Sequence, residues 1–158
     1  MMKSVKSKII TLAKATAWRN TQKRLGKKVV FTNGCFDVIH SGHVTLLEKA
    51  RKLGDFLVIG LNSDTSVKSI KGKDRPINKQ SDRALVLAAM SAVDIVVIFN
   101  EDTPYNLLKK LQPDILVKGA DYKTNQVIGR EFAKKVVTVP LVKGKSTSKT
   151  ISILKHSC

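Results

Sequence analysis

Two histidines three residues apart, His40 and His43, stand in a loop that also carries Gly34 and Gly42. At this spacing both side chains can lie on one face of a first helical turn. A helix start presents free backbone N–H groups, and imidazole N–H groups beside them can donate hydrogen bonds to phosphate oxygens. Three interpretations follow: local hydrogen bonds only, a metal site, or a phosphate site. A metal site lacks support, because the sequence has neither an HExxH motif nor a cysteine cluster.

Other phosphate-binding motifs are incomplete. The GxGxxG pattern is absent, and Gly144-Lys145-Ser146 resembles only the end of a P-loop, whose first glycine would fall at Val139. A Walker-type kinase is therefore excluded. Cys35 lies inside the histidine loop, but direct phosphoryl chemistry needs no thiol, so we do not expect it to act as a nucleophile.

The elements that must position this loop alternate between strand and helix. We predict strands at residues 29–32, 56–61, 95–99, 115–117 and 136–139. Helices are expected at 4–25, 43–53 and 82–92, from Thr103-Pro104 onward, and after Ser146-Thr147. The strands are continuously apolar, which is typical of a parallel sheet covered on both faces. The pattern predicts a doubly wound α/β fold with a five-stranded sheet, a single domain over 1–158 and an added N-terminal helix.

Ligands of such sheets bind beyond the carboxyl ends of the strands. The loops that follow the predicted strands are therefore the candidate binding segments. The segment between the second strand and the next helix is expected to be a long polar loop. These segments are residues 33–43, 62–80, 100–103, 118–130 and 143–148.

Composition limits the partners. The 158 residues carry a formal net charge of +17, aromatic residues make up only 5%, and there are two cysteines. No apolar run is long enough for a transmembrane helix, and no secretory signal is visible, so a reducing cytoplasmic setting is expected. A basic nucleic-acid-binding module remains an alternative function, but the lysines are spread along the chain and no RNP-like, KH or zinc-finger pattern is present.

Residues 34–43 match the GxFDxxHxGH signature, so the chain resembles the cytidylyltransferase-like nucleotidyltransferases with their Rossmann-like fold. Over roughly residues 8–154 it is similar to one branch, the ADP-heptose synthases or D-glycero-β-D-manno-heptose 1-phosphate adenylyltransferases. The further segments that carry this similarity are Asn62-Ser63-Asp64, Lys71-Gly72, Arg75-Pro76-Ile77-Asn78, Asp82-Arg83, Val93-Asp94, Glu101-Asp102-Thr103-Pro104, Lys118-Gly119-Ala120-Asp121-Tyr122 and Ser146-Thr147.

The resemblance implies a reaction in which a sugar 1-phosphate attacks the α-phosphorus of ATP and pyrophosphate leaves, with Mg²⁺ bridging the phosphates. Lipopolysaccharide core or a related glycan would be the destination of the product. It further implies small-molecule substrates, no specific nucleic acid, no membrane, a homodimer and a separate sugar kinase upstream. Within the same fold, glycerol-3-phosphate cytidylyltransferase is the nearest alternative activity.

The resemblance also assigns residues. His40, His43 and Lys71 are expected to be catalytic. Expected nucleotide contacts are Asn33, Gly34, Cys35, Phe36, Asp37, Gly42, Lys118, Gly119, Asp121, Ser146, Thr147 and Ser148. Asp37, Asn62, Asp64, Arg75 and Arg83 are expected at the acceptor substrate, and no residue is assigned to a metal.

Several of these assignments have a structural alternative. Phe36 can serve packing, Asp37 can orient its loop, and a salt bridge would explain Arg83 as well as an anionic partner does. Two departures from the family pattern stand out: Ser148 occupies a place where threonine is usual, and residues 126–139 are shorter than the typical connection.

Overall fold

In the computed structural model, residues 4–120, 123–140 and 142–156 are described. Five strands form one parallel sheet in the order β3-β2-β1-β4-β5. They are β1 (Val29–Gly34), β2 (Phe56–Asn62), β3 (Ile95–Phe99), β4 (Ile115–Gly119) and β5 (Lys135–Val139). The predicted five-stranded parallel sheet is confirmed, with strand ends within a few residues of those expected.

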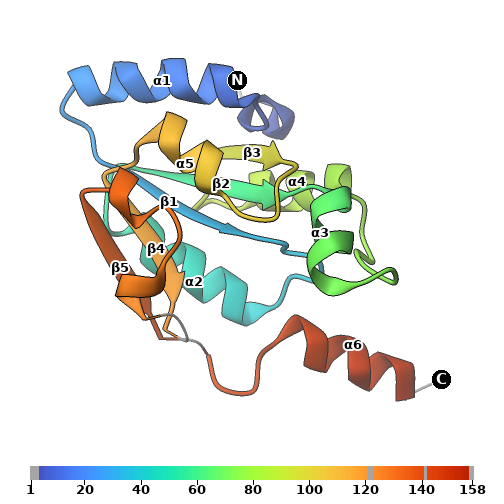
Figure 1. Ribbon diagram of the computed structural model, residues 1–158. Coiled ribbons are helices and arrows are strands. Elements are labelled where there is room, and N and C mark those ends of the chain that lie inside the picture. The colour runs from blue at the N-terminus through green and yellow to red at the C-terminus, as the bar shows by residue number, and fades with distance from the viewer. Residues whose placement is uncertain (1–3, 121–122, 141, 157–158) are drawn as a thin grey trace.

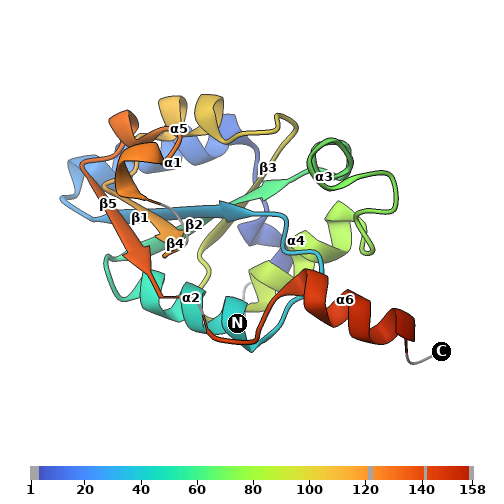
Figure 2. The same cartoon turned by 60° about the horizontal axis from the view of Figure 1, so that its bottom comes forward.

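Helices cover both faces of the sheet (Figures 1 and 2). One face carries α1 (Leu12–Arg24) and α5 (Tyr105–Leu111), and the other carries α2 (Ser41–Arg51) and α4 (Gln80–Ala89). The α5 side contributes Leu107, Leu108 and Leu111, all buried, and burying each such side chain contributes about 1.5–3 kcal/mol. The doubly wound arrangement is the one that continuously apolar strands require.

The predicted N-terminal helix at 4–25 is wrong as one continuous helix. A 3-10 helix, η1 (Val5–Lys8), comes first, and Ile9 then pairs with Val96 in an isolated parallel bridge. The α-helix begins only after Thr11, whose side chain accepts a hydrogen bond from the Lys14 amide at 3.3 Å. Hydrogen bonding to the edge strand β3 therefore interrupts a sequence whose apolar spacing alone fits a longer helix.

The helices expected at 43–53 and 82–92 are α2 and α4, each of which begins two residues earlier than predicted. Two further segments differ from prediction. The expected loop at 62–80 contains α3 (Asp64–Lys71), whose first turn is capped by the Ser63 hydroxyl. Helix α5 begins at Tyr105 rather than at Thr103-Pro104, because the carbonyl of Pro104 already accepts the first helical bond from the Leu108 amide at 2.9 Å. Thr103 therefore lies one residue too early to cap the helix.

The C-terminal helix α6 (Thr147–His156) follows Ser146-Thr147 as predicted. It projects from the sheet beside the N-terminal end of α2 (Figure 2). Between β5 and α6 the chain returns to the loop after β1, where the Thr147 hydroxyl donates to the Val38 carbonyl at 3.1 Å. Two short 3-10 helices precede β5: η2 (Thr124–Gln126) ends where the shortened 126–139 segment begins, and η3 (Arg130–Phe132) lies within it.

Candidate active site

The strand order reverses between β1 and β4, and a cavity of about 350 Å³ lies where these strands end. Ligands of open α/β sheets bind at this switch point. Asn33 and Gly34 close β1, Lys118 and Gly119 close β4, and the Lys118 ammonium donates to the Asn33 side-chain oxygen across the gap. The two strand ends are thereby linked at the cavity.

The cavity collects many of the residues that the sequence singled out. Its lining includes Asn33, Gly34, Cys35, Phe36, Asp37, His43, Asn62, Lys71, Arg75, Lys118, Gly119 and Thr147. Thr32, Leu46, Ile70 and Asp102 also line it and were not predicted as site residues. Ile70 was missed because it belongs to α3, and the polar residues of this segment led us to predict a loop there. Asp102 did lie in a loop expected at the correct sheet edge, and that position was the available signal.

The two histidines open α2 as a reciprocal cap. The Nδ1 atom of His40 accepts from the Gly42 amide at 3.1 Å, and the Nδ1 atom of His43 accepts from the His40 amide at 3.3 Å. Because both Nδ1 atoms are acceptors, each neutral ring carries its proton on Nε2. Each Nε2–H group is therefore a donor that the cap does not use.

Packing fixes the orientation of these rings. The centroids of His40 and His43 are 3.9 Å apart with an interplanar angle of 33°, and the Phe36 ring lies 5.3 Å from that of His43. A Cβ atom at Gly42 would come within 2.9 Å of the His40 ring. Glycine at this position is therefore needed for the ring arrangement.

Burial and neighbouring charge keep both imidazoles neutral. Burial, assisted by His40, lowers the pKa of His43 to about 4. The pKa of His40 is also lowered, by burial and by the positive charge of Lys145. At neutral pH both rings are therefore uncharged hydrogen-bond donors at the helix start, where backbone N–H groups also favour an anion.

This lowered pKa makes folding stability depend on pH. An unfolded histidine titrates near pH 6.5, whereas His43 in the folded chain is protonated only near pH 4. Between these pH values the unfolded chain binds a proton that the folded chain does not bind. The contribution is complete above pH 6.5 and is lost as the pH falls toward 4. We expect the thermal midpoint to drop between about pH 6.5 and pH 5, and to drop less in His43→Gln, which does not titrate. Calorimetry of both proteins across this range checks it; parallel curves would contradict the expected role of His43.

Asp37 anchors the loop that leads to α4. Its buried carboxylate accepts from the amides of Ile77 and Asn78 and from the Arg75 guanidinium, each at 2.8 Å. Burial opposes ionisation, but these hydrogen bonds outweigh it and lower the pKa of Asp37. The structure thus supports the loop-orienting alternative for Asp37. Arg75 is held beside the cavity, and its Nη2 atom has no hydrogen-bond partner among the described residues.

Arg83 is almost fully buried in α4, with an exposed fraction of 2%. It donates to the backbone carbonyls of Asn78, Cys35 and Asn62 at 2.9, 2.6 and 2.8 Å, and pairs with Asp64 at 2.8 Å. It does not line the described cavity. The salt-bridge alternative is therefore the observed one, and the expected contact of Arg83 with an acceptor substrate has no geometric support here. Its partners lie in the loop after β1, at the end of β2, at the start of α3 and in the segment before α4.

The remaining predicted residues are placed around this framework. Asn62 lines the cavity, but its side-chain amide group donates a hydrogen bond to the Ser66 hydroxyl at 2.9 Å. Ser146 caps α6 by accepting from the Lys149 amide at 3.1 Å, and Ser148 is exposed. Asp64, Ser146 and Ser148 do not line the described cavity, nor do His40 and Gly42. Asp121 lies outside the described residues.

Cys35 lines the cavity as a half-buried thiol. Burial raises the pKa of this thiol, and the cations Lys71, Arg83 and Arg75 only partly offset the effect. A protonated thiol is a poor nucleophile. We therefore expect Cys35→Ser to keep turnover within about threefold of the parent in a pyrophosphate-release assay. Loss of more than about a hundredfold in a normally folded variant would restore a nucleophilic role.

Within the described segments, no group of three or more His, Cys, Asp or Glu residues could hold a metal ion, and no helix is long and apolar enough to cross a membrane. Both carboxylate oxygens of Asp37 already accept hydrogen bonds from Arg75, Ile77 and Asn78. The other carboxylate on the described lining is that of Asp102. Such a sparse donor set fits Mg²⁺, which keeps several waters and is bound largely through substrate phosphates.

Comparison with solved structures supports the fold. A lipopolysaccharide core biosynthesis protein from Thermoplasma volcanium superposes with a TM-score of 0.64 at 27% identity, over 75% of this chain and 100% of that one. The pantoate-beta-alanine ligase of Francisella tularensis gives a TM-score of 0.63 at 18% identity, over 89% of this chain and 68% of that one. The second likeness concerns the fold alone.

Sequence comparison covers most of the chain. The bifunctional protein HldE of Campylobacter fetus is 59% identical over 84% of this chain, and that of Nitratiruptor is 58% identical over 84%. This chain spans only 29% of the length of either relative. A sequence profile described as Cytidylyltransferase-like matches residues 31–155. The match includes the histidine cap, both strand ends at the cavity and the start of α6, and the chain therefore belongs to the cytidylyltransferase-like family.

Proposed function

We propose that this chain transfers AMP from ATP to a heptose 1-phosphate, which releases pyrophosphate and forms ADP-heptose. The observation that carries the proposal is the pair of neutral imidazoles at the start of α2, whose Nε2–H donors are left free by the cap at the switch point of the sheet. The high identity to the HldE proteins supports the sugar substrate.

The reaction requires little proton transfer. A sugar phosphate oxygen is already anionic, so it can attack the α-phosphorus without a strong general base, and the bond to the pyrophosphate oxygen breaks. Catalysis then depends on positioning and on charge stabilisation. His40 and His43 donate to phosphate oxygens, while Lys71 and Lys118 supply positive charge at the cavity. Bound Mg²⁺ would neutralise charge on the triphosphate.

Other residues act by holding these groups. Asp37 fixes Arg75 beside the cavity. The Nη2 atom of Arg75, which has no partner in the part of the chain that the structure describes, is a donor suited to the acceptor phosphate. Gly42 leaves room for the His40 ring. Thr147 brings the start of α6 to the loop after β1, where Ser146 and Thr147 can approach the nucleotide.

The test is a pyrophosphate-release screen that crosses ATP and CTP with heptose 1-phosphates of both anomers and glycerol 3-phosphate. We expect release with ATP and a heptose 1-phosphate. Release only with CTP and glycerol 3-phosphate would replace the proposal with a cytidylyltransferase, an activity that the description of the family profile favours. No release with any pair, together with tight salt-sensitive RNA binding, would favour a nucleic-acid-binding module.

The proposal has consequences for partners. A sugar kinase must supply the 1-phosphate, and we propose that it acts as a separate enzyme in the cytoplasm, where ATP is available. We also propose a homodimer, which sedimentation of the purified chain can test against a monomer of 17.4 kDa.

A further inference from the structure

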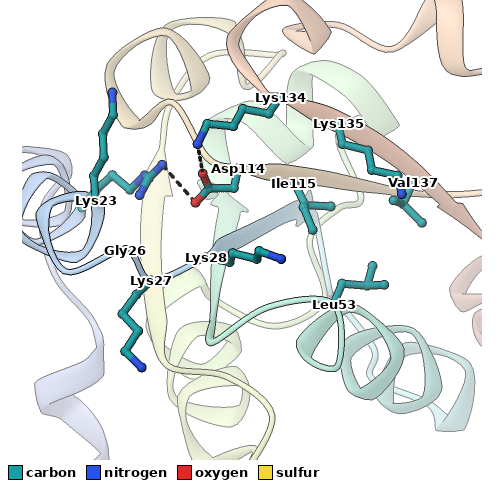
Figure 3. A pocket seen from close by; sticks show the side chains of 11 residues that line it. Lys23, Gly26, Lys27, Lys28, Leu53, Asp114, Ile115, Lys134, Lys135 and Val137 are labelled. Atoms are coloured by element: carbon teal, nitrogen blue, oxygen red, sulfur yellow. Dashed lines mark ion pairs between the residues drawn. The ribbon is translucent and has the colours of Figure 1, made fainter.

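A second cavity, of about 470 Å³, lies at the opposite edge of the sheet, where the strands begin (Figure 3). Its floor includes Leu53, Ile115 and Val137. Its cations come from four places: α1, the segment before β1, the segment before β5, and the first residue of β5. They are Arg19, Lys23, Lys27, Lys28, Lys134 and Lys135. A volume of this size suits a small organic ligand.

One carboxylate serves two of these cations. The Asp114 side chain pairs with Arg19 at 3.0 Å and with Lys134 at 2.8 Å, and it also accepts from the Val29 amide at 2.8 Å. Both of its oxygens are therefore occupied. Burial opposes ionisation of Asp114, but the hydrogen bonds from Lys134 and Val29 and the charge of Arg19 lower its pKa. Asp114 thus stays ionised, yet it balances only one of its two partners.

The remaining positive charge is uncompensated. Lys27 pairs with Asp55 at 3.7 Å, but Lys23, Lys28 and Lys135 form no ion pair among the described residues. In Figure 3, Lys28 points toward the space between Ile115 and Leu53, whereas Lys27 points away from it. Arg19 is 3% exposed, and its buried Nη1 atom has no hydrogen-bond partner within the described chain. Buried donors of charged groups normally have partners, so Arg19 leaves one donor unsatisfied beside this cavity.

Backbone groups around the cavity are already used. The amides of Lys28, Phe56 and Lys135 donate to Asp55, Lys28 and Asp114 at 2.7, 3.2 and 3.1 Å. An anion would therefore be held by side chains, and lysine ammonium groups bind phosphate as compact point charges. The apolar floor offers a surface for the organic part of a phosphorylated molecule.

We propose that this cavity binds the phosphate or pyrophosphate group of a small phosphorylated molecule. The site is independent of the proposed adenylyl transfer, because it lies at the beginnings of the strands and shares no lining residue with the cavity at their carboxyl ends. Such a site would use six of the basic residues that give the chain its large positive charge.

Sodium pyrophosphate is the probe, and backbone amide NMR of the full chain is the measurement. Gly26, Leu53 and Val137 report on this cavity, and Gly34 and Gly119 report on the other one. We expect saturable shifts at the first group that exceed those from sodium chloride at the same ionic strength. The double variant K28Q/K135Q should weaken that binding about tenfold or more while the shifts at Gly34 and Gly119 persist. Both lysines are exposed, so the fold should be retained.

The matched control is K49Q/K109Q, which removes the same charge from exposed positions on α2 and α5. It should bind as the parent does. Equal weakening in both double variants, or shifts no larger than those from chloride, would overturn the proposal. Binding of a single-stranded RNA of about 20 nucleotides to the same residues, about a hundredfold more tightly than pyrophosphate, would also overturn the proposal. The surface would then be a nucleic-acid-binding site. These outcomes are separate from adenylyl transfer, which the pyrophosphate-release screen measures.

Discussion

Replacing His43 with alanine is expected to lower kcat by about 10²–10³ while KM for ATP changes much less. The Nε2–H donor of His43 is held in place by the bond from the His40 amide at 3.3 Å and by packing against Phe36 and His40. A donor fixed before the reaction stabilises charge that develops at phosphorus, and alanine cannot replace it. The measurement is steady-state pyrophosphate release at saturating substrates.

Val44→Ala is the matched control for this variant, because Val44 is the next residue of α2 and its side chain is 40% exposed. It should turn over at nearly the parent rate. If His43→Ala also kept near-normal turnover while its thermal midpoint matched that of the control, His43 would have no part in the chemistry. The proposed role of the imidazole pair would then fail.

Replacing Arg83 with lysine is expected to destabilise the fold by about 3–5 kcal/mol. The guanidinium reaches three backbone carbonyls and the Asp64 carboxylate from one buried position. A lysine ammonium has three donors on one atom and cannot span acceptors placed around a planar fork. Some of the carbonyls at Cys35, Asn62 and Asn78 would then stay buried without partners. Urea unfolding measures the difference in free energy.

Arg51→Lys provides the comparison. Arg51 pairs with Asp94 at 3.0 Å, but its side chain is 35% exposed, so the same replacement should cost about 1 kcal/mol or less. An Arg83→Lys variant no less stable than Arg51→Lys would contradict the anchoring role. Should Arg83→Lys fail to fold, Asp64→Asn removes only the charge of one of the four partners and should give a folded protein with an intermediate loss of stability.

Replacing Arg83 should also lower catalysis at the candidate active site. Arg83 holds the Cys35 carbonyl in the loop between β1 and α2, and this loop leads to His40 and His43 at the start of α2. Arg83 is therefore a positioning residue, although it lies outside the cavity. Its test combines the unfolding measurement with kcat, since a merely structural residue elsewhere, such as Arg51, should leave kcat unchanged.

The fold class could be predicted from the amino-acid sequence. Continuously apolar strands that alternate with helices require a parallel sheet covered on both faces, and Gly34 to His43 identify the loop at its carboxyl edge. These are local properties, since strand composition and helix capping depend on residues close together in the chain. The boundaries predicted least well were η1 with Ile9 and helix α3. Pairing with Val96 interrupts the first segment, and the short α3 has few apolar positions to indicate it.

Which charged residues line the cavity and which are buried in the fold could not be predicted from the sequence, because it depends on how distant segments pack. Arg75 and Arg83 are eight residues apart, yet one lines the cavity and the other is enclosed by four partners from separate segments of the chain. Likewise, no spacing in the chain predicts that Arg19, Lys28 and Lys135 surround one cavity. The physical reason is that burial and hydrogen bonding between distant segments arise from packing, which brings together residues that the linear pattern leaves unrelated.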